Sequence, residues 1–467
     1  MSLSYEFKNA WKVMDENEYS KAMDYAKGYM KFLDTGKTER ECATEIIRQA
    51  KENGYISIEE VLERGSLKEG DKIYANNKEK GVALFVIGKE ELEKGMRIVG
   101  GHLDAPRLDL KQFPLYEDGN MAYLKTHYYG GIKKYQWTSI ALSLHGVVFK
   151  KDGTKVDIVI GEDLNDPILY ITDLLPHLAK DQMAKKLDEG ITGEQLNVVV
   201  GHIPLKEEGE DKDKDKDPVK KQVLKLLNEK YGITEEDFLS AEIEIVPAEK
   251  SREVGLDRGM ISAHGHDDRV CSYAALKGIF DLNEVPNKTA VALFVDKEEV
   301  GSMGNTGMES KFFENTVAEL VNIEGNYSDL KVRRAMANSE VLSADVTAGF
   351  DPNFPEVMDK RNGAMIGHGV VLTKYTGVRG KGGSNDANAE FLSKVRSILD
   401  ENEVVWQIGE LGKVDQGGGG TIAYILANYG AEVVDCGVPM LSMHAPVELV
   451  SKADIYMTYK AYRGFFK

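Results

Sequence analysis

The sequence has 467 residues, enough for two domains with a large core. Its composition, 42% hydrophobic and 29% charged, is typical of soluble globular proteins. With 77 acidic and 59 basic residues, the formal net charge is -18. This charge argues against nucleic acid or an anionic membrane as the main partner, because both require a basic face.

The N-terminal segment, the apolar runs and the cysteines all bear on the cellular compartment of the protein. The N-terminal residues lack a basic segment followed by an apolar core, so they do not predict a signal peptide. No apolar run is long enough to span a bilayer. The three cysteines, Cys42, Cys271 and Cys436, are widely separated and predict buried thiols rather than disulfides or a metal site. We therefore expect a cytoplasmic protein.

The first hundred residues contain helical patterns followed by strand patterns. Trp11 and Met14 open an amphipathic pattern that predicts helix. Apolar runs at 82–87 and 96–99 predict strands, and the second run leads into 100–104, Gly-Gly-His-Leu-Asp.

The hydrophobic pattern of the sequence changes between residues 105 and 250. Short β-rich runs at 140–149 and 156–160 are separated by turn signals. The mixed-charge run 207–217 cannot bury itself and predicts a solvated surface loop, with an interaction tail as the alternative.

Alternating strand and helix patterns follow from residue 251. The wholly apolar run 291–295 predicts a strand buried on both faces, and 432–436 predicts another strand. Ser384 is a candidate N-cap for a helix whose apolar face includes 387–398.

The simplest architecture joins the two ends of the chain into one domain. Residues 1–104 and 251–467 would form a catalytic α/β domain, interrupted by a β-rich insert at 105–250.

Histidine and acidic residues follow several of the apolar strands, where sites assemble in open α/β sheets. His102 can bind a metal ion while Asp104 accepts its other ring N–H. Taken without the other motifs, the pair is also explained if His102 is an ordinary surface histidine. The segment 264–269, His-Gly-His-Asp-Asp-Arg, precedes a helix, so its aspartates fit either helix capping or a carboxylate bridging two metal ions.

The segment 296–302, Asp-Lys-Glu-Glu-Val-Gly-Ser, directly follows the buried strand. Its adjacent Glu298 and Glu299 would repel each other on desolvation unless a cation lay nearby. One glutamate would then bind the metal while the other accepted a proton from water. A solvated acidic loop is the alternative.

Asp345 in Ser-Ala-Asp and His444 in Met-His complete the candidate set, although each alone would more often be structural. Together the motifs supply histidine nitrogen and carboxylate oxygen, a set that suits zinc, with cobalt or manganese as substitutes.

With these motifs in this order, most of the chain resembles the aspartyl aminopeptidase family of two-metal exopeptidases. The resemblance implies a zinc-exopeptidase-like α/β/α catalytic domain with an inserted β-rich dimerisation domain. The implied activity is removal of the N-terminal residue from short peptides, with an acidic residue as the family's preference.

The resemblance also implies residue roles around two zinc ions per chain. The ligands would be His102, Asp267, Glu299, Asp345 and His444. Asp267 would bridge the ions, with His102 and Asp345 completing one site and Glu299 and His444 the other. Glu298 would be the general base for a bridging water, Asp104 would orient His102, and the Asp267–Asp268 peptide would be cis.

Two segments of the predicted insert also resemble segments of the family. Segments 129–132, Tyr-Gly-Gly-Ile, and 175–178, Leu-Pro-His-Leu, resemble family segments in the domain used for dimer contacts. His177 corresponds to a histidine that reaches a neighbouring subunit's active site and donates to the oxyanion. A surface helix residue is the alternative. The resemblance thus implies a homo-oligomer built from dimers, with a dodecamer as one form.

Lys374 matches the position where the family places a cation for an acidic side chain, and a solvated lysine is the alternative.

Some segments depart from the family. The stretch 346–353 lacks histidines expected after Asp345, and His266 replaces an apolar residue. The run 415–420, Asp-Gln-Gly-Gly-Gly-Gly, lacks a phosphate-loop ending and predicts a close approach or a hinge.

The sequence leaves the preferred N-terminal residue and the physiological peptide open. Two other readings also remain: a two-metal deacylase or carboxypeptidase on a related scaffold, and a non-catalytic assembly protein with a relic site.

Overall fold

The computed structural model describes residues 3–206 and 216–467. The chain divides into two compact units, here called the main unit and the insert unit. The main unit comprises Met1–Ala105, Ser251–Met443 and Glu448–Lys467, and the insert unit comprises Pro106–Lys250 and His444–Val447. The segment from 444 to 447 thus groups with the insert unit, whereas the sequence placed it in the α/β domain. Most of the charged run 207–217 lies outside the described residues.

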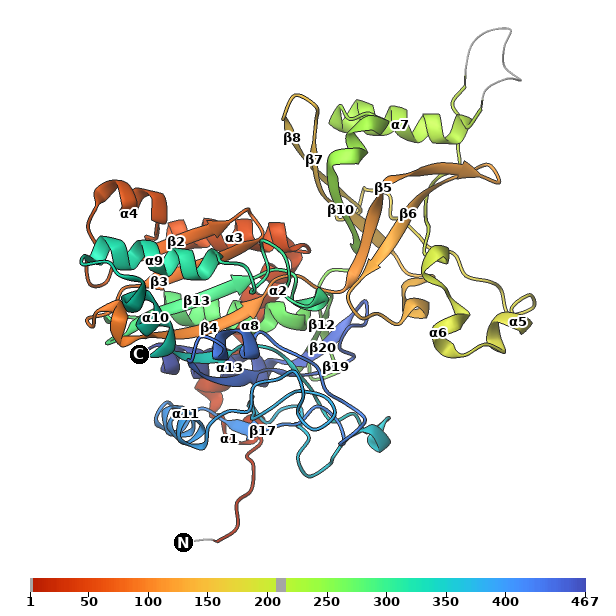
Figure 1. Cartoon of the computed structure of the whole chain (residues 1–467). Helices are drawn as coiled ribbons and strands as arrows, with labels where there is room; N and C mark the ends of the chain where they lie inside the picture. Colours follow the sequence, from red (N-terminus) through yellow and green to blue (C-terminus); the bar gives the residue numbers. More distant parts are fainter. Residues whose placement is uncertain (1–2, 207–215) are drawn as a thin grey trace. The chain divides into compact units, whose positions relative to one another are not determined.

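A nine-stranded mixed sheet forms the centre of the main unit, in the order β1-β2-β3-β13-β4-β14-β18-β16-β17 (Figure 1). Its strands are β1 (Ile56–Ser57), β2 (Lys72–Asn77), β3 (Gly81–Val86), β4 (Met96–His102), β13 (Thr289–Val295), β14 (Glu340–Ser343), β16 (Val370–Thr373), β17 (Trp406–Ile408) and β18 (Glu432–Gly437). The central strands β13, β4, β14 and β18 run parallel, so their carboxyl ends meet at one edge. At that edge Val295 pairs with His102.

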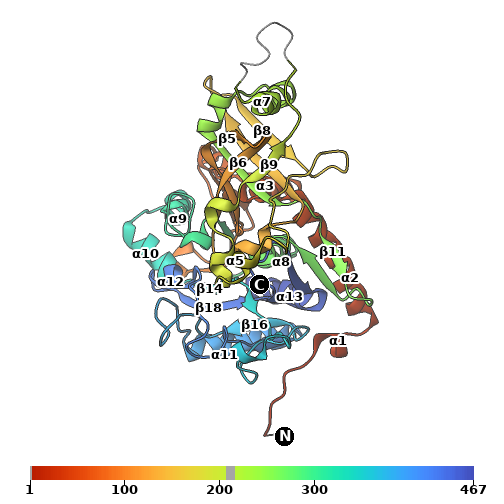
Figure 2. The same ribbon diagram turned by 90° about the vertical axis from the view of Figure 1, so that its right-hand side faces the viewer.

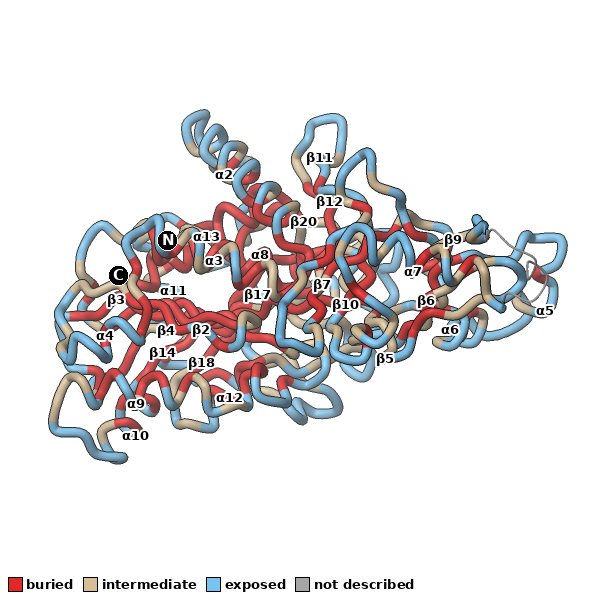
Figure 3. The backbone as a smooth tube through the Cα atoms, turned by 90° about the horizontal axis from the view of Figure 1, so that it is seen from above, coloured by how far each residue is buried: buried red, intermediate tan, exposed pale blue. Residues whose placement is uncertain are grey.

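Helices cover both faces of this sheet (Figure 2). One face is covered by α2 (Glu16–Thr35), α3 (Glu39–Glu52), α8 (His266–Phe280), α11 (Ala389–Glu401) and α13 (Lys452–Phe466). The other is covered by α4 (Ile58–Arg64), α9 (Phe312–Glu324), α10 (Asp329–Ala337) and α12 (Ala423–Ala427). Figure 3 shows the buried strands between the two helical layers. The main unit is therefore an α/β/α sandwich, the fold class expected from the sequence.

The position of strand β13, between two cores, explains why the run 291–295 is wholly apolar. Ala292 and Phe294 belong to the core on one face, while Val291 and Leu293 belong to the core on the other. Because successive side chains of a strand point to opposite faces, a strand covered on both sides needs apolar residues at every position.

Helix α11 begins later than the sequence predicted. Its N-cap is Asn388, and Ser384 lies in the preceding turn. The backbone N–H of Ala387 donates to the carbonyl oxygen of Lys374 at 2.9 Å, which holds this segment outside the helix. By contrast, α3 begins with a complete capping box in which Thr38 and Glu41 satisfy each other's backbone N–H groups.

The main unit is completed by shorter elements. A five-stranded sheet contains β11 (Arg252–Val254), β12 (Met260–Ala263), β20 (Glu448–Ser451), β19 (Pro439–Leu441) and β15 (Thr347–Ala348). The remaining helical turns are α1 (Ala10–Val13), η1 (Leu92–Lys94), η6 (Glu298–Val300) and η7 (Pro355–Val357). Across the described chain, every helix is too short or too polar to cross a bilayer.

The insert unit is built on a six-stranded antiparallel sheet in the order β8-β7-β10-β5-β6-β9. Its strands are β5 (Arg107–Asp118), β6 (Met121–Tyr129), β7 (Leu142–Phe149), β8 (Lys155–Ile160), β9 (Val198–Gly201) and β10 (Ala241–Pro247). Its helices are α5 (Lys180–Met183), α6 (Leu187–Gly190), α7 (Pro218–Tyr231), η2 (Lys134–Trp137), η3 (Gly193–Gln195) and η5 (Glu235–Ser240). This unit has its own apolar core, which includes Trp137 and Phe238.

The three cysteines are free and buried, as their spacing predicted. They therefore serve as small apolar side chains in the core of the main unit.

Candidate metal centre

His102 is the last residue of β4, at the carboxyl edge of the central sheet, and its side chain is buried. Its Nδ1 lies 3.3 Å from Oδ1 of Asp104 and 3.0 Å from the carbonyl oxygen of Asp104. A proton on Nδ1 would serve both acceptors and leave the Nε2 lone pair pointing the other way. Nε2 faces Oδ1 of Asp267 at 3.2 Å and Oε2 of Glu298 at 3.8 Å.

Glu298 and Glu299 lie on the turn η6, immediately after β13. Lys297 enters this turn with a left-handed backbone, at φ 65°. The backbone N–H groups of both glutamates donate to the carboxylate of Asp104, each at 3.2 Å. Asp104 therefore anchors the turn that carries the acidic pair.

Asp267 and Asp268 are buried at the start of α8, and the peptide bond between them is cis, as the resemblance implied. The Asp267 N–H donates to Oε2 of Glu448 at 3.1 Å. Asp268 accepts from the backbone N–H of His102 at 3.3 Å. These contacts aim the two carboxylates in different directions, one at the His102 ring and the other at its backbone.

Asp345 follows β14 and is partly buried. A Cβ on Gly437, at the end of β18, would lie 1.8 Å from the carbonyl oxygen of Asp345, so that position excludes any other residue. Gly101 is also constrained, because a Cβ there would lie 2.6 Å from Oδ2 of Asp268 and 3.0 Å from the carbonyl oxygen of Ala344. The close packing of these backbones brings the ends of β4, β14 and β18 together.

The side chains at this edge form potential metal-binding groups. Ligand atoms of His102, Asp267 and Asp345 lie within 4.8 Å of one another, as do those of His102, Glu298 and Glu299. Burial, together with the carboxylates of Glu298, Asp268 and Asp267, raises the pKa of Asp345. Crowded carboxylates of this kind are stabilised by a cation.

The imidazole provides a test of whether a metal ion fits. Burial disfavours charge on His102, but the carboxylates of Asp104, Asp267 and Glu298 outweigh it and raise the pKa of His102. Within residues 3–206 and 216–467, its buried Nε2 has no hydrogen-bond partner. A buried ring nitrogen facing carboxylate oxygens, with its other nitrogen held by Asp104, is the arrangement expected of a zinc ligand.

One known protein family matches most of the chain. The family described as aminopeptidase I zinc metalloprotease (M18) matches residues 32–466. The chain belongs to the M18 family. M18 aminopeptidases are the aspartyl aminopeptidase family, so the resemblance found in the motifs is confirmed, and the protein is a zinc-dependent aminopeptidase.

Similar proteins span the full length of the chain. A probable M18 family aminopeptidase 1 of Clostridium acetobutylicum is 55% identical over 461 residues, covering 98% of each chain. The crystal structure of an M18 aminopeptidase from Thermotoga maritima superposes with a TM-score of 0.94 at 45% identity, covering 99% of this chain and 100% of the other. That of aminopeptidase I from Clostridium acetobutylicum gives a TM-score of 0.91 at 52% identity, covering 100% of both.

Two expected M18 site residues belong to the insert unit. His444 opens the segment His444–Val447, and its Nδ1 lies 2.9 Å from the carbonyl oxygen of Gly131. A proton on Nδ1 would leave the Nε2 lone pair available to a metal ion. His177 lies in an exposed turn, closed by a hydrogen bond from the Leu178 N–H to the Leu175 carbonyl at 3.0 Å, and not in a helix.

Lys374 lies just after β16, and its ammonium pairs with the carboxylate of Asp386. Asp386 also pairs with Lys381 at 2.9 Å. The Lys374 charge is therefore already compensated by a carboxylate of the same unit, which bears on any role in binding an acidic substrate.

Two residues that contact the candidate ligands carried no sequence signal. Glu448 supports the Asp267 backbone from 181 positions away, and Ser272 donates from its hydroxyl to the His102 carbonyl at 2.9 Å. Neither belongs to a recognisable motif. A hydrogen bond between residues so far apart in the sequence can be recognised only once the fold is known.

The glycine run near residue 417 forms a close backbone approach, one of the two expected structures. A Cβ on Gly417 would lie 2.0 Å from the carbonyl oxygen of Leu411, and one on Gly418 would lie 2.6 Å from that of Gly377. Side chains are therefore excluded at both positions.

Proposed function

We propose that the carboxyl edge of the central sheet binds two zinc ions and removes the N-terminal residue from short peptides. The observation that carries this proposal is the buried Nε2 of His102, which faces the carboxylates of Asp267 and Glu298. Cobalt or manganese would substitute for zinc at a mixed nitrogen and oxygen site.

The proposed ligand assignment combines the family resemblance with the contacts of each residue. Asp267 would bridge the ions, with His102 and Asp345 completing one site. The proximity of these three side chains supports that half of the assignment. Glu299 and His444 would complete the other site. For His444, support comes from the Gly131 carbonyl, which would fix its tautomer.

Glu298 is the proposed general base. When bound, the zinc ions would lower the pKa of a water molecule and polarise the substrate carbonyl. Glu298 would accept the proton of that water and pass it to the leaving amine. Asp104 would keep this carboxylate in place through the backbone N–H of Glu298. The free N-terminus of the peptide would lie near the carboxylates, which limits cleavage to one residue.

Metal content and turnover test this proposal together. The protein would be stripped with a chelator, dialysed against zinc, and analysed for metal while the hydrolysis of aminoacyl anilides is followed. We expect two zinc ions per chain and activity that returns with them. A content that never exceeds one ion per chain at saturating zinc would rule out the two-ion site, and zinc-loaded protein without aminopeptidase activity would rule out the function.

The proposed substrates include peptides with an acidic N-terminal residue, as the family name implies. Lys374 is the proposed cation for that side chain, although its ion pair with Asp386 would have to open on binding. A panel of Asp, Glu, Leu and Lys anilides decides whether the acidic residues are preferred.

A homo-oligomer of dimers in the cytoplasm is the proposed working form. A yeast relative, mApe1, forms a dodecamer. In this chain the turn that carries His177 also exposes Leu174, Leu175 and Leu178, an apolar patch suited to burial between subunits. His177 would then complete a neighbouring subunit's site and stabilise the oxyanion.

Mixing inactive variants tests the shared site. His177→Ala should lose activity and keep its zinc, and so should Glu298→Gln. If subunits share sites, exchanging the two proteins should restore activity, because some mixed dimers contain one site with both groups intact. A fully active monomer in light scattering at assay concentration would show that no neighbour is needed.

A further inference from the structure

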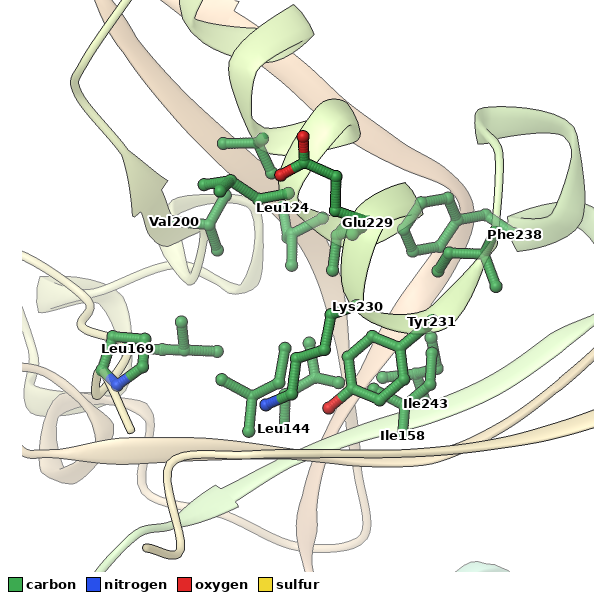
Figure 4. A pocket seen from close by; sticks show the side chains of 16 residues that line it. Leu124, Leu144, Ile158, Leu169, Val200, Glu229, Lys230, Tyr231, Phe238 and Ile243 are labelled. Carbon is green, nitrogen blue, oxygen red and sulfur yellow. The ribbon is translucent and has the colours of Figure 1, made fainter. Parts of the chain in front are cut away.

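The insert unit contains an apolar cavity of about 480 Å³ between α7 and the six-stranded sheet (Figure 4). Its walls come from five strands, the helix and the turn η5, and include Leu124, Leu144, Ile158, Val200, Leu227 and Phe238. Protein interiors are packed densely enough that voids much larger than a water molecule are rare. A cavity of this size falls instead in the range of small-molecule sites, which are mostly apolar with a few polar groups.

Polar atoms reach the cavity from the C-terminal turn of α7. Figure 4 shows Lys230 and Tyr231 reaching toward the same side of the cavity. The Tyr231 hydroxyl donates to the carbonyl oxygen of Val159 at 2.6 Å, so that group is already used. The ammonium of Lys230 has Asp166 as a distant partner, at 3.5 Å, and both side chains are partly exposed. Such an ion pair is weak and easily exchanged.

The charge of α7 contrasts with that of the whole chain. The chain has 77 acidic and 59 basic residues, yet the 14 residues of α7 include four lysines and one glutamate. At the C-terminal end of this helix Lys230 and Glu229 both line the cavity, and Glu229 pairs with Lys225 at 3.8 Å, so an anionic group there would be held by the Lys230 ammonium itself.

We propose that this cavity binds a small amphipathic molecule with a slim alkyl chain and an anionic head, a carboxylate in the simplest case. The chain would occupy the apolar space between α7 and the sheet, and the head would replace Asp166 as the partner of Lys230. This site lies wholly within the insert unit and does not depend on the metal centre.

Binding of straight-chain alkanoates to the zinc-loaded full-length protein tests the proposal. Octanoate to hexadecanoate would be titrated by calorimetry below their micelle concentrations. We expect one site per chain, with affinity rising about fourfold per added methylene. The rise should stop once the chain fills the cavity. Nonspecific adsorption would instead show no plateau and no fixed stoichiometry, and either result would overturn the proposal.

Cavity-filling variants locate the site. Leu227→Trp on α7 and Val200→Phe on β9 fill the space from two different elements and should each weaken dodecanoate binding at least about tenfold. Leu239→Trp adds the same bulk to an exposed position that does not line the cavity, and should change nothing. Peptidase activity and the unfolding midpoint show that each variant is folded. Unchanged dodecanoate binding in both folded filling variants would reject the site.

Head-group variants test the role of Lys230. Lys230→Gln should weaken dodecanoate binding about tenfold and leave dodecanol binding unchanged, whereas Lys225→Gln on the same helix should affect neither. Asp166→Asn should strengthen dodecanoate binding because it removes the competing carboxylate. If the filling variants alter only the oligomeric state, the cavity receives a neighbouring subunit rather than a small molecule, and the proposal fails.

Discussion

The carboxylate of Asp104 lies against the imidazole of His102, with Oδ1 3.3 Å from Nδ1, and also accepts the backbone N–H groups of Glu298 and Glu299. One buried side chain thus couples the strand that carries the histidine to the turn that carries both glutamates. Neither group can move without disturbing the contacts of the other.

Replacing Asp104 tests this coupling. In Asp104→Asn the amide N–H₂ would face a backbone N–H donor, so at least one hydrogen bond to the turn or the ring is lost. We expect zinc affinity to fall roughly 10- to 100-fold, as for other residues that orient metal ligands. Saturating zinc should not fully restore kcat/KM, because the Glu298 turn is also released. A competition assay with a zinc-binding dye measures the first effect, and Asp24→Asn, at an exposed position of α2, serves as the control.

Substitutions of the two adjacent glutamates should have different effects. Glu298→Gln keeps the shape and removes the base, so kcat should fall by roughly 10²- to 10⁴-fold while the zinc content is unchanged. Glu299→Gln should lower the zinc affinity, and excess zinc should restore part of its activity. If Glu298→Gln turns over substrate at a near-normal rate, the assignment of the base is wrong.

The role of Lys374 can be distinguished from that of Lys381, because both lysines pair with Asp386. If Lys374 binds an acidic side chain, Lys374→Met should lower kcat/KM for Asp and Glu anilides at least about tenfold and spare the Leu anilide. Lys381→Met should affect all substrates alike. Asp386→Asn would release Lys374 and should favour the acidic substrates. An equal effect of Lys374→Met on all anilides would exclude it from substrate selection.

Asp454 should make stability depend on pH. Burial raises the pKa of Asp454 to about 8, although the backbone N–H groups of Gly367 and Gly369 favour its ionised form. An aspartate in an unfolded chain titrates near pH 4. Between these values the folded state binds one more proton, so this group's contribution, complete below about pH 4, is lost as the pH rises through about 8.

Urea unfolding of the wild type and of Asp454→Asn measures this effect. The asparagine cannot ionise, so the stability advantage of the wild type over the variant should shrink between pH 5 and pH 8, by at most about 1.4 kcal/mol per pH unit. Asp24→Asn should give a difference that stays constant. A constant difference for Asp454→Asn as well would show that the residue is already ionised in the folded protein.

The sequence carried most of the information about this fold. The run 291–295 revealed a strand buried on both faces because covering both sides removes every polar position. His102, Glu298 and Glu299 could be recognised because they lie at or just after the carboxyl end of a strand, where residues far apart in the chain converge.

Other features depended on contacts that no local pattern encodes. Glu448 supports Asp267 across 181 positions, and a single glutamate carries no periodicity that would reveal it. Ser384 has a good N-cap side chain, yet α11 starts at Ala389, because the pairing of Ala387 with Lys374 keeps the chain extended. In both cases a long-range hydrogen bond decides the local structure.

The order of strands also has a consequence for biosynthesis. Strand β4 is made early, but its two neighbours in the sheet, β13 and β14, lie after the segment Pro106–Lys250 of the insert unit. A growing chain therefore presents His102 on an unpaired strand until β13, which ends at Val295, has been made, and the second edge of β4 stays open until β14 follows. The peptidase centre would assemble only near the end of translation, so unfinished chains would be inactive and would depend on late pairing to bury the edges of β4.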